Sequence, residues 1–239
     1  MSTELSASQL AGLDDSHLVM LPCGHRLQSE AAAAFKLLQA DAAQAGFELT
    51  IASGYRAFER QLAIWNGKAC GERPVHDDAG CPVPMAALPP RDRLYAILRF
   101  SAIPGTSRHH WGSDMDVFDA AAVPLDYQLQ LSPQEVASGG VFDPLHNWLD
   151  ERMALGLSRG FYRPYARDRG GVAPERWHLS YAPLALPCES RIDPALLRQC
   201  WDGACPGEAL LLRDVIELEL ATILERFVEV ERGWCTLNS

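Results

Sequence analysis

The sequence lacks the usual marks of a secreted, membrane-spanning or nucleic-acid-binding protein. Its longest apolar run falls far short of the roughly 20 residues that a helix needs to cross a bilayer. Residues 1–21 contain no basic segment followed by an apolar core, so a secretory signal is not expected. The net charge of −10 argues against a nucleic-acid partner, which requires a basic face, and against a polybasic membrane anchor. We therefore expect a cytoplasmic protein, or one that leaves the cell by a route that these residues do not display.

The sequence also has no Cys-x-x-Cys pair. Its seven cysteines are an odd number, so an obligate disulfide framework is not expected. Cys70, His76 and Cys81 lie close together in a loop and could bind a structural metal, and Cys70 and Cys81 could form a disulfide in an exported protein. We favour a third interpretation, in which these cysteines are free thiols in a loop insertion.

What the chain does contain is an ordinary supply of core residues. Of its 239 residues, 48% are hydrophobic and 22% are charged, which is typical of a globular protein. A chain of this length forms one large domain or two small ones, and its core is large enough to fold without a metal or a disulfide. A metal site in this chain is therefore expected to be catalytic rather than structural.

Periodicity and turn residues predict helices interspersed with short strands. Strands are expected at 47–52, 115–118 and 177–181, and an extended segment is expected to begin at Gly160. Helical spacing and capping residues, with Ser29 and Asp143 as N-caps, predict helices at 30–45, 57–66, 92–100, 143–156, 194–202 and 206–231. The long loop between residues 66 and 90 is expected to be functional, or an insertion over a site.

Residues 107–116 hold two histidines, a glycine and two aspartates. Histidine and aspartate are zinc ligands, and a catalytic zinc site has three protein ligands and one open position. Gly112 lets the chain fold back, so that His109 and Asp116 can converge on one ion. His110 competes with His109, because adjacent residues of an extended chain point opposite ways and only one can reach the ion. The alternative for this stretch is a polar turn without a metal.

A second stretch, residues 174–181, could supply the third ligand and a base. His178 lies on a predicted strand, and Glu175 lies just before it. A carboxylate three residues from a ligand histidine can reach the water that a zinc ion activates, accept its proton and pass that proton to a leaving amine. A surface glutamate and a core histidine are the alternative.

A third stretch, Ser53 to Arg56, ends a predicted strand. Arg56 could stabilise the oxyanion of a tetrahedral intermediate, or it could pair with a substrate carboxylate. An arginine in a solvated turn is the alternative interpretation.

Together the three stretches resemble the zinc D-alanyl-D-alanine carboxypeptidases and dipeptidases of the VanY and VanX type, the LAS metallopeptidases, which share their fold with the amidase domain of Hedgehog proteins. Three signatures of that family are matched. They are Ser-x-His-x-x-Gly-x-Ala-x-Asp, Glu-x-x-His with Trp before the His, and Ser-x-Tyr-Arg with Gln five residues on. The matching residues are Ser107, His109, Gly112, Asp116, Glu175, Trp177, His178, Ser53, Tyr55, Arg56 and Gln61. The resemblance covers roughly residues 30–182 and does not extend to the chain from about residue 188.

The resemblance implies one Zn²⁺ per chain, with a base and an electrophilic arginine beside it. The zinc ligands would be His109, Asp116 and His178. Glu175 would be the catalytic base, and Arg56 would polarise the scissile carbonyl. The candidates for substrate binding are Ser53, Tyr55, Gln61 and Ser107, and the candidates for supporting the ligands are Asp114 and Trp177. Asp114 stands where the family usually has Ala, so it either orients a ligand histidine, binds substrate or faces solvent.

We predict an α+β fold, in which a small antiparallel sheet carries the zinc site and helices flank it. Residues 1–187 would form the catalytic domain, and residues 188–239 a helical C-terminal extension packed on it. The apolar stripe of the helix at 206–231 is either a packing surface or a dimer surface, so the oligomeric state is open. The stripe consists of Leu210, Leu211, Val215, Leu218, Leu220 and Ile223.

The predicted function is removal of the terminal D-alanine from peptidoglycan stem peptides or their precursors. The motifs determine the chemistry and not the stereochemistry, so an L,D-carboxypeptidase or a crosslink-cleaving D,D-endopeptidase is an alternative. A zinc-containing binding module without catalysis is a further alternative, which the presence of Glu175 disfavours. Cytoplasmic precursors, recycled muropeptides or release of the protein by a non-classical route would each bring enzyme and substrate together.

Overall fold

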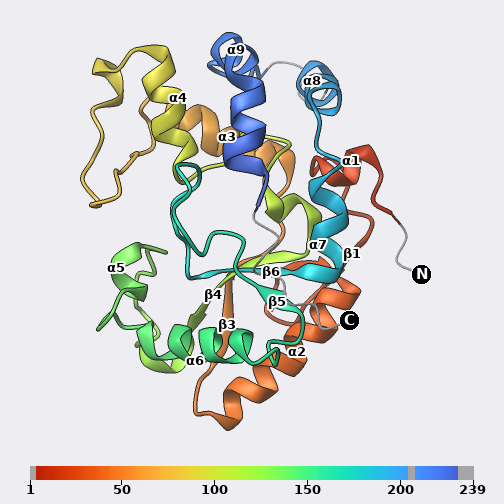
Figure 1. The fold of residues 1–239 in the computed structure, drawn as a ribbon, viewed down its shortest axis with the longest axis vertical. Helices are drawn as coiled ribbons and strands as arrows, with labels where there is room; N and C mark the ends of the chain where they lie inside the picture. The colour runs from red at the N-terminus through yellow and green to blue at the C-terminus, as the bar shows by residue number, and fades with distance from the viewer. Residues whose placement is uncertain (1–3, 204–207, 231–239) are drawn as a thin grey trace.

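The fold is described by a computed structural model, in which residues 4–203 and 208–230 are placed (Figure 1). The strands are β1 (Leu18–Met20), β2 (Arg26–Gln28), β3 (Leu49–Ser53), β4 (Asp114–Asp119), β5 (Phe161–Tyr162) and β6 (His178–Tyr181). The α-helices are α1 (Ala7–Leu10), α2 (Ser29–Gln44), α3 (Phe58–Ala69), α4 (Pro90–Leu98), α5 (Pro133–Val136), α6 (Asp143–Ala154), α7 (Ala182–Glu189), α8 (Pro194–Gly203) and α9 (Arg213–Ile223). Short 3-10 turns cover Met85–Ala87, Arg108–Trp111 and Ala120–Ala122, and a π turn, Leu224–Val228, continues α9.

The central sheet is small and antiparallel, as predicted. Its four strands lie in the order β3-β4-β6-β5, and β1 pairs with β2 in a separate ribbon. In the pair of β4 and β6, Asp116 lies directly opposite His178, and Asp114 lies opposite Ser180. This register places polar side chains from distant parts of the sequence side by side on one face of the sheet.

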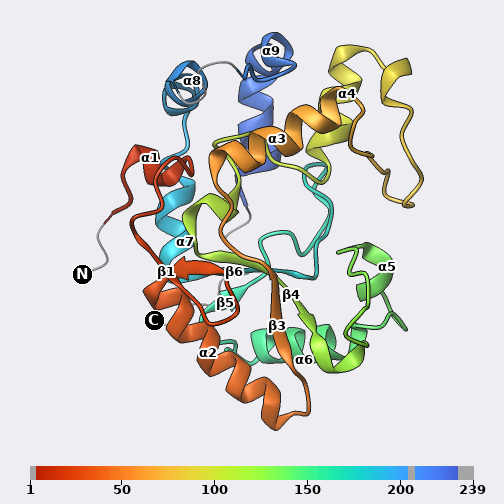
Figure 2. The same ribbon diagram turned by 180° about the vertical axis from the view of Figure 1, so that it is seen from behind.

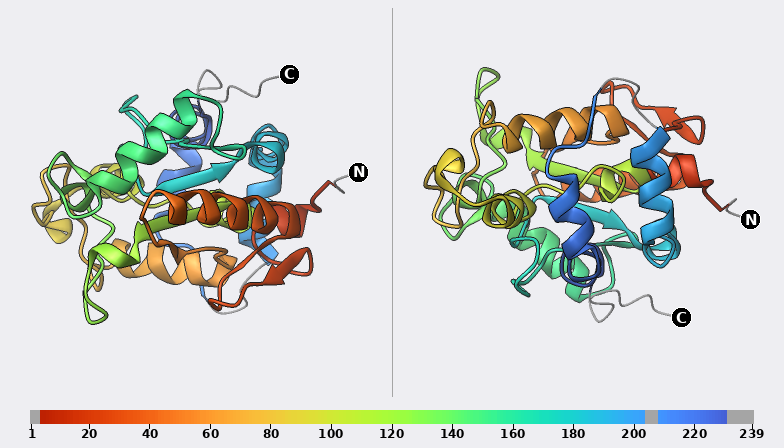
Figure 3. Two further views of the ribbon diagram at one scale, coloured as in Figure 1. Left: turned by 90° about the horizontal axis from the view of Figure 1, so that it is seen from below. Right: turned by 90° about the horizontal axis from the view of Figure 1, so that it is seen from above.

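The opposite face of the sheet is apolar and is covered by α2 and α6 (Figure 3). Alternation along β4 and β6 sends Met115, Val117 and Leu179 to this face, where each is buried. They pack with Phe35 and Leu38 of α2 and with residues of α6. Burial of one face therefore fixes which residues of β4 and β6 point the other way, into the site.

A second layer of helices lies on the polar side of the sheet, with α3, α4, α7, α8 and α9 around one core (Figures 1 and 2). Trp65 of α3, Leu94 of α4 and Ile216 of α9 are fully buried in this core. The C-terminal helices therefore share their core with the catalytic part of the chain. Pro187, where we placed the boundary between the two parts, lies inside α7.

Helix boundaries differ from the prediction at several ends. Ser29 and Asp143 are the first residues of α2 and α6, and the N-cap residues are Gln28 and Phe142. The predicted helix at 206–231 begins only at Arg213, and residues 204–207 and 231 lie outside the described residues. Residues before α9 instead bond to α3, with Trp65 Nε1 donating to the Leu211 carbonyl at 3.0 Å. Tertiary contacts thus replace helical ones in this segment.

Half of the predicted apolar stripe is used inside the chain. Its members Leu210, Leu220 and Ile223 are buried, whereas Leu211 and Leu218 are 40% and 86% exposed. No helix in residues 4–203 or 208–230 combines the length and the apolar character that crossing a membrane requires.

The long loop after α3 forms one wall of a cavity that also contains the metal-ligand candidates. Within it, His76 and Pro82 form an isolated antiparallel bridge. Cys70 and Cys81 are exposed free thiols. Among the described residues, the side chains that could hold a metal together do not include Cys70, His76 or Cys81.

Candidate active site

Three side chains predicted to be metal ligands converge in the structure. His109 lies on the 3-10 turn Arg108–Trp111, Asp116 on β4 and His178 on β6. Gly112 ends the turn with a φ of 68°, in the left-handed region that glycine adopts readily, and the chain then enters β4. The turn brings His109 over the strand pair that aligns Asp116 with His178.

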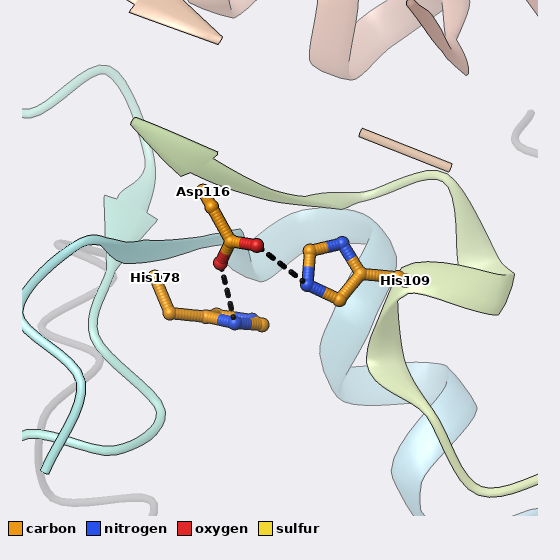
Figure 4. A group of neighbouring side chains, drawn as sticks. All are labelled: His109, Asp116 and His178. Carbon is orange, nitrogen blue, oxygen red and sulfur yellow. Dashed lines mark ion pairs between the residues drawn. The ribbon is translucent and has the colours of Figure 1, made fainter. Parts of the chain in front are cut away.

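The spacing of the three side chains suits a metal ion (Figure 4). Asp116 Oδ2 lies 3.4 Å from His109 Nε2, and Asp116 Oδ1 lies 3.4 Å from His178 Nδ1. One possible ligand atom from each residue lies within 4.8 Å of the others. Ligands held about 2.0–2.2 Å from a tetrahedral zinc ion lie about 3.3–3.6 Å from one another. Asp116 Oδ1 is buried without a hydrogen-bond partner among the described residues, as expected for an atom that binds a cation.

Each histidine is oriented by its other ring nitrogen. His109 Nδ1 donates to the Gly54 carbonyl at 2.9 Å, which leaves Nε2 facing Asp116. His178 Nε2 donates to Asp114 Oδ1 at 2.9 Å, which leaves Nδ1 facing Asp116. Such partners determine the tautomer and the direction of metal-ligating histidines. Asp114 is therefore placed behind His178 and not in solvent.

A buried ion-pair network holds Asp114 in turn. Its Oδ1 accepts from Arg108 Nε at 2.8 Å and its Oδ2 accepts from Ser113 Oγ at 2.6 Å. Arg108 also donates to Glu189 of α7, to Tyr162 and to Ser180. The arrangement stabilises the carboxylate form, because Arg108 and His178 outweigh the effect of burial and hold the pKa of Asp114 well below its usual range.

The electrostatics of the cluster favour a bound cation. Burial lowers the pKa of His178, but the hydrogen bonds and charges of Asp114 and Asp116 outweigh it and raise that pKa to about 9. Burial raises the pKa of Asp116, but His109 and His178 outweigh it and hold the pKa well below the usual range. A metal ion would take the place of the proton that these groups attract between them.

His110, the competing ligand, is engaged elsewhere. Its Nδ1 donates to the Arg56 carbonyl at 2.6 Å, and its Nε2 accepts from the Gly105 amide at 3.1 Å. The ring stacks on Phe58, and burial lowers its pKa to about 3. The two histidines lie in a 3-10 turn and not in the extended chain that we assumed, yet their side chains still diverge.

Glu175 lies beside the cluster, as its position before β6 predicted. Its Oε2 is 3.6 Å from His178 Nδ1, and its amide donates to the Tyr165 carbonyl at 2.9 Å. Burial, with the negative charge of Asp116 adding to it, raises the pKa of Glu175 to about 7. A carboxyl group with such a pKa can both accept and release a proton near neutral pH.

Arg56 faces the same cavity from the end of the β3 segment. Its guanidinium donates to Gln61 Oε1 at 3.0 Å and to Ser53 Oγ at 3.3 Å. Burial lowers the pKa of Arg56, and the nearby carboxylates of Asp116 and Glu175 oppose that effect. The cation is thus held in position close to both carboxylates.

A cavity of about 460 Å³ opens beside these groups. Residues predicted to belong to the site line this cavity, namely Arg56, Ser107, His109, Asp116, Glu175, Trp177 and His178. Residues without a predicted role also line it, among them Lys68, Phe100, Ser101, Leu131, Tyr165 and Val172. Tyr165, whose ring lies 5.1 Å from that of His178, precedes Glu175 by only ten residues, but nothing in its sequence context indicates a site.

Three substrate-binding candidates do not line the cavity. Gln61 is fully buried, and it accepts from Arg56 while donating to the Ala102 carbonyl at 2.6 Å. Ser53 contacts the opposite nitrogen of the same guanidinium. Tyr55 donates to the Gly12 carbonyl at 3.0 Å and lies under Arg26. In the structure Gln61 and Ser53 position Arg56, and Tyr55 contacts the N-terminal segment. Direct contact of these three residues with the substrate stays a prediction.

Comparison with known proteins agrees with this geometry. The sequence profile of the VanY family, described as D-alanyl-D-alanine carboxypeptidase, matches residues 24–184. A Haemophilus influenzae protein described as uncharacterized is 46% identical over 104 residues, which are 42% of this chain and 71% of that protein. Another from the same organism, also described as uncharacterized, is 34% identical over 127 residues, 53% of this chain and 92% of that protein.

A solved structure, VanYB in complex with D-alanine-D-alanine, has a similar fold. The two chains are 21% identical with a TM-score of 0.51, over 86% of this chain and 91% of VanYB. The match to the family profile covers more than half of the sequence and contains all three ligand candidates, Glu175 and Arg56. This chain belongs to the VanY family of D-alanyl-D-alanine carboxypeptidases.

Proposed function

We propose that this protein is a zinc carboxypeptidase that hydrolyses the terminal D-Ala-D-Ala peptide bond of peptidoglycan stem peptides or their precursors. The observation that carries the proposal is the meeting of Glu175 and Arg56 with three metal-ligand candidates in one cavity. A zinc peptidase can use all three groups, namely a metal to activate water, a base and a cation for the developing oxyanion.

His109 Nε2, Asp116 and His178 Nδ1 would hold one Zn²⁺. Two nitrogen ligands and one carboxylate are a donor set that catalytic zinc sites use. Zinc bound there would supply Lewis acidity and would lower the pKa of a water molecule toward ~7. Asp114 would keep His178 in the tautomer that presents Nδ1 to the metal.

Glu175 would accept the proton of the attacking water and deliver it to the nitrogen of the departing D-alanine. Its pKa of about 7 suits both steps. Near neutral pH, much of such a group is ionised and can accept a proton, and its protonated form readily donates one. Arg56, held by Gln61 and Ser53, would stabilise the negative charge that develops on the scissile carbonyl oxygen. Ser107 and Trp177 line the cavity and remain candidates for contacting or positioning the substrate.

The direct test is mass spectrometry of pentapeptide, tetrapeptide and crosslinked stems after incubation with the zinc-loaded protein. We expect loss of one D-alanine from the pentapeptide alone. Cleavage of the tetrapeptide would instead indicate the L,D-carboxypeptidase, and cleavage of crosslinked stems the endopeptidase. No cleavage of any stem would contradict a cell-wall peptide as the substrate. Cytoplasmic pentapeptide precursors are the first substrate to use, because we predict a cytoplasmic location.

Glu175→Ala separates an enzyme from a non-catalytic zinc module. It should retain one zinc per chain, measured by metal analysis, and lose turnover by on the order of 10²–10⁴-fold, as removal of a general base typically does. Glu151→Ala, at an exposed position of α6, is the matched control and should keep full activity. A Glu175→Ala protein that hydrolyses as fast as the parent would overturn the mechanism.

A further inference from the structure

Lys68 is a half-buried cation that lines the cavity and has no role in the proposed reaction. It lies in the last turn of α3, two helical turns after Gln61, so both residues face the same side of the helix. Its ammonium donates to Ser101 Oγ at 2.7 Å, while Gln61 donates to the neighbouring Ala102 carbonyl at 2.6 Å. These two bonds fix the segment that contains Ser101 and Ala102 against α3, and both of those residues line the cavity with Lys68.

The Lys68 ammonium differs from the other cations of the cavity in its partners. Arg108 forms buried ion pairs with Asp114 and Glu189, and Arg56 is held by Gln61 and Ser53. None of the ion pairs within the described part of the chain includes Lys68, and Ser101 is its single hydrogen-bond partner there. An ammonium has three N–H donors, so two are left for another group.

A charge that is partly removed from water and lacks a counterion is costly, and burial lowers the pKa of Lys68 accordingly. The charge of Glu175 opposes this shift and that of Arg56 adds to it, and both groups line the same cavity as Lys68. A ligand carboxylate at this place would complete the pairing of Lys68.

The substrate of a carboxypeptidase brings such a carboxylate to a defined place. Only two covalent bonds separate the leaving nitrogen from the carbon of the terminal carboxylate. That carbon therefore lies within about 4 Å of the scissile carbonyl carbon. A group that binds it must line the same cavity as the base and the oxyanion cation, as Lys68 does.

We propose that Lys68, positioned by Ser101, binds the C-terminal carboxylate of the peptide substrate and so restricts the enzyme to the last peptide bond of a chain. The inference rests on the proposed function, because it concerns the substrate of that same site. A peptide cut at an internal bond has an amide instead of a carboxylate at this position, and it would leave Lys68 unpaired. Lys68 thus favours a carboxypeptidase over an endopeptidase.

The test compares two substrates, an acylated D-Ala-D-Ala peptide and the same peptide with a C-terminal carboxamide. The parent should prefer the free carboxylate by about 10- to 100-fold in kcat/KM, the typical effect of a hydrogen bond to a charged group. Lys68→Met should lose most of that preference, mainly through a higher KM for the carboxylate peptide. Lys68→Arg should restore part of it.

The chain has only two lysines, so Lys36→Met is a matched control on the exposed side of α2. It should leave the preference unchanged. Zinc content and circular dichroism establish that each variant is folded. If Lys68→Met lowers kcat equally for both peptides and shifts the pH profile, then Lys68 acts on Glu175 and the proposal is wrong. A parent that cleaves both peptides equally well also contradicts it, while leaving the proposed function standing.

A second measurement does not depend on turnover or on a substitution at Lys68. Reductive methylation of zinc-loaded Glu175→Ala protein, with and without the acylated D-Ala-D-Ala peptide, reports on both lysines by mass spectrometry. The peptide should protect Lys68 and leave Lys36 unaffected, and the carboxamide peptide should protect Lys68 less. Equal labelling of Lys68 with either peptide or none would overturn the proposal. A parent that cleaves neither peptide contradicts the proposed function instead.

Discussion

Two buried arginines, Arg108 behind the metal-ligand cluster and Arg163 against α6, differ in how completely their polar groups are paired. Every guanidinium nitrogen of Arg108 donates to a partner, and two of those partners are carboxylates. Arg163 pairs with Asp150 at 2.8 Å, but its Nη1 is buried without a partner among the described residues. Asp150 itself is 45% exposed, so its charge is screened by solvent.

The charge state of each arginine follows from these partners. Burial disfavours the charge of Arg108, yet Asp114, Tyr162 and Glu189 outweigh it and hold the pKa of Arg108 well above the usual value. Burial lowers the pKa of Arg163, and Asp150 does not fully compensate. The fully hydrogen-bonded arginine is therefore the one whose partner, Asp114, orients His178.

The largest expected effect is on stability, when each arginine is replaced by Met. Arg108→Met removes the arginine partner of the buried Asp114 carboxylate and leaves it only His178 and Ser113. We therefore expect a loss of about 3–5 kcal/mol in the free energy of unfolding. Arg163→Met leaves only a solvent-screened Asp150, so a loss of about 1 kcal/mol or less is expected. Urea unfolding monitored by circular dichroism measures both.

The two arginine variants are compared with and without zinc, because a ligand that binds only the folded state adds to its apparent stability. Equal losses for both variants in metal-free protein would show that the two networks contribute alike to the free energy of unfolding, contrary to this prediction.

A smaller effect is expected for Asp114→Asn, which keeps the shape of the side chain but removes its charge. His178 would lose the carboxylate that orients its Nε2–H, so zinc affinity should fall about 10- to 100-fold. Competition with a chelator of known zinc affinity measures this. Asp150→Asn on the Arg163 side is the matched control. A zinc affinity that stays at the parent's value in Asp114→Asn would assign Asp114 a role in packing alone.

The effect that is smallest at neutral pH concerns the acid side of the stability profile. His146 is fully buried beside Arg163, and burial, with Arg163 and Arg176 adding to it, lowers its pKa to about 2. The unfolded chain takes up a proton on this histidine below about pH 6.5, and the folded chain does not. The contribution of neutral His146 to the free energy of unfolding is therefore fully present above that pH. It is lost as the pH falls toward 2, by about 1.4 kcal/mol per pH unit for one proton.

His146→Gln should reduce this dependence. Between pH 6 and 4 its free energy of unfolding should fall less steeply than that of the parent, by up to about 1.4 kcal/mol per pH unit. His76→Gln, at an exposed loop position, is the control. Parallel profiles of the parent and His146→Gln would mean that His146 is protonated in the folded state as readily as in the unfolded chain.

Much of the site was predictable because its residues lie at short, fixed spacings. Gly112 between His109 and Asp116 allows only a tight reversal, and the Glu175 to His178 spacing places a base beside a ligand. The choice of His109 over His110 followed from the resemblance, and the structure supplies its reason, since both ring nitrogens of His110 bond to the backbone. The contacts of Gln61 and Ser53 with Arg56 could not be predicted, because the position of the Arg56 guanidinium depends on contacts between β3 and α3.

Residue types and spacing alone predict the class of chemistry, the positions of the strands that carry it and the apolar alternation that turns one face of β4 and β6 to the core. These are local properties, since they depend on residue type and on a period of two along a strand. The contacts between groups that are far apart in the sequence depend on the tertiary structure. The register that sets Asp116 opposite His178 and the network that joins Asp114 to Arg108 and Glu189 depend on packing between elements far apart in the chain. The position of Lys68 in the same cavity as Glu175 depends on it too. Such contacts have no periodicity in the sequence, because they arise from the way whole helices and strands share one core.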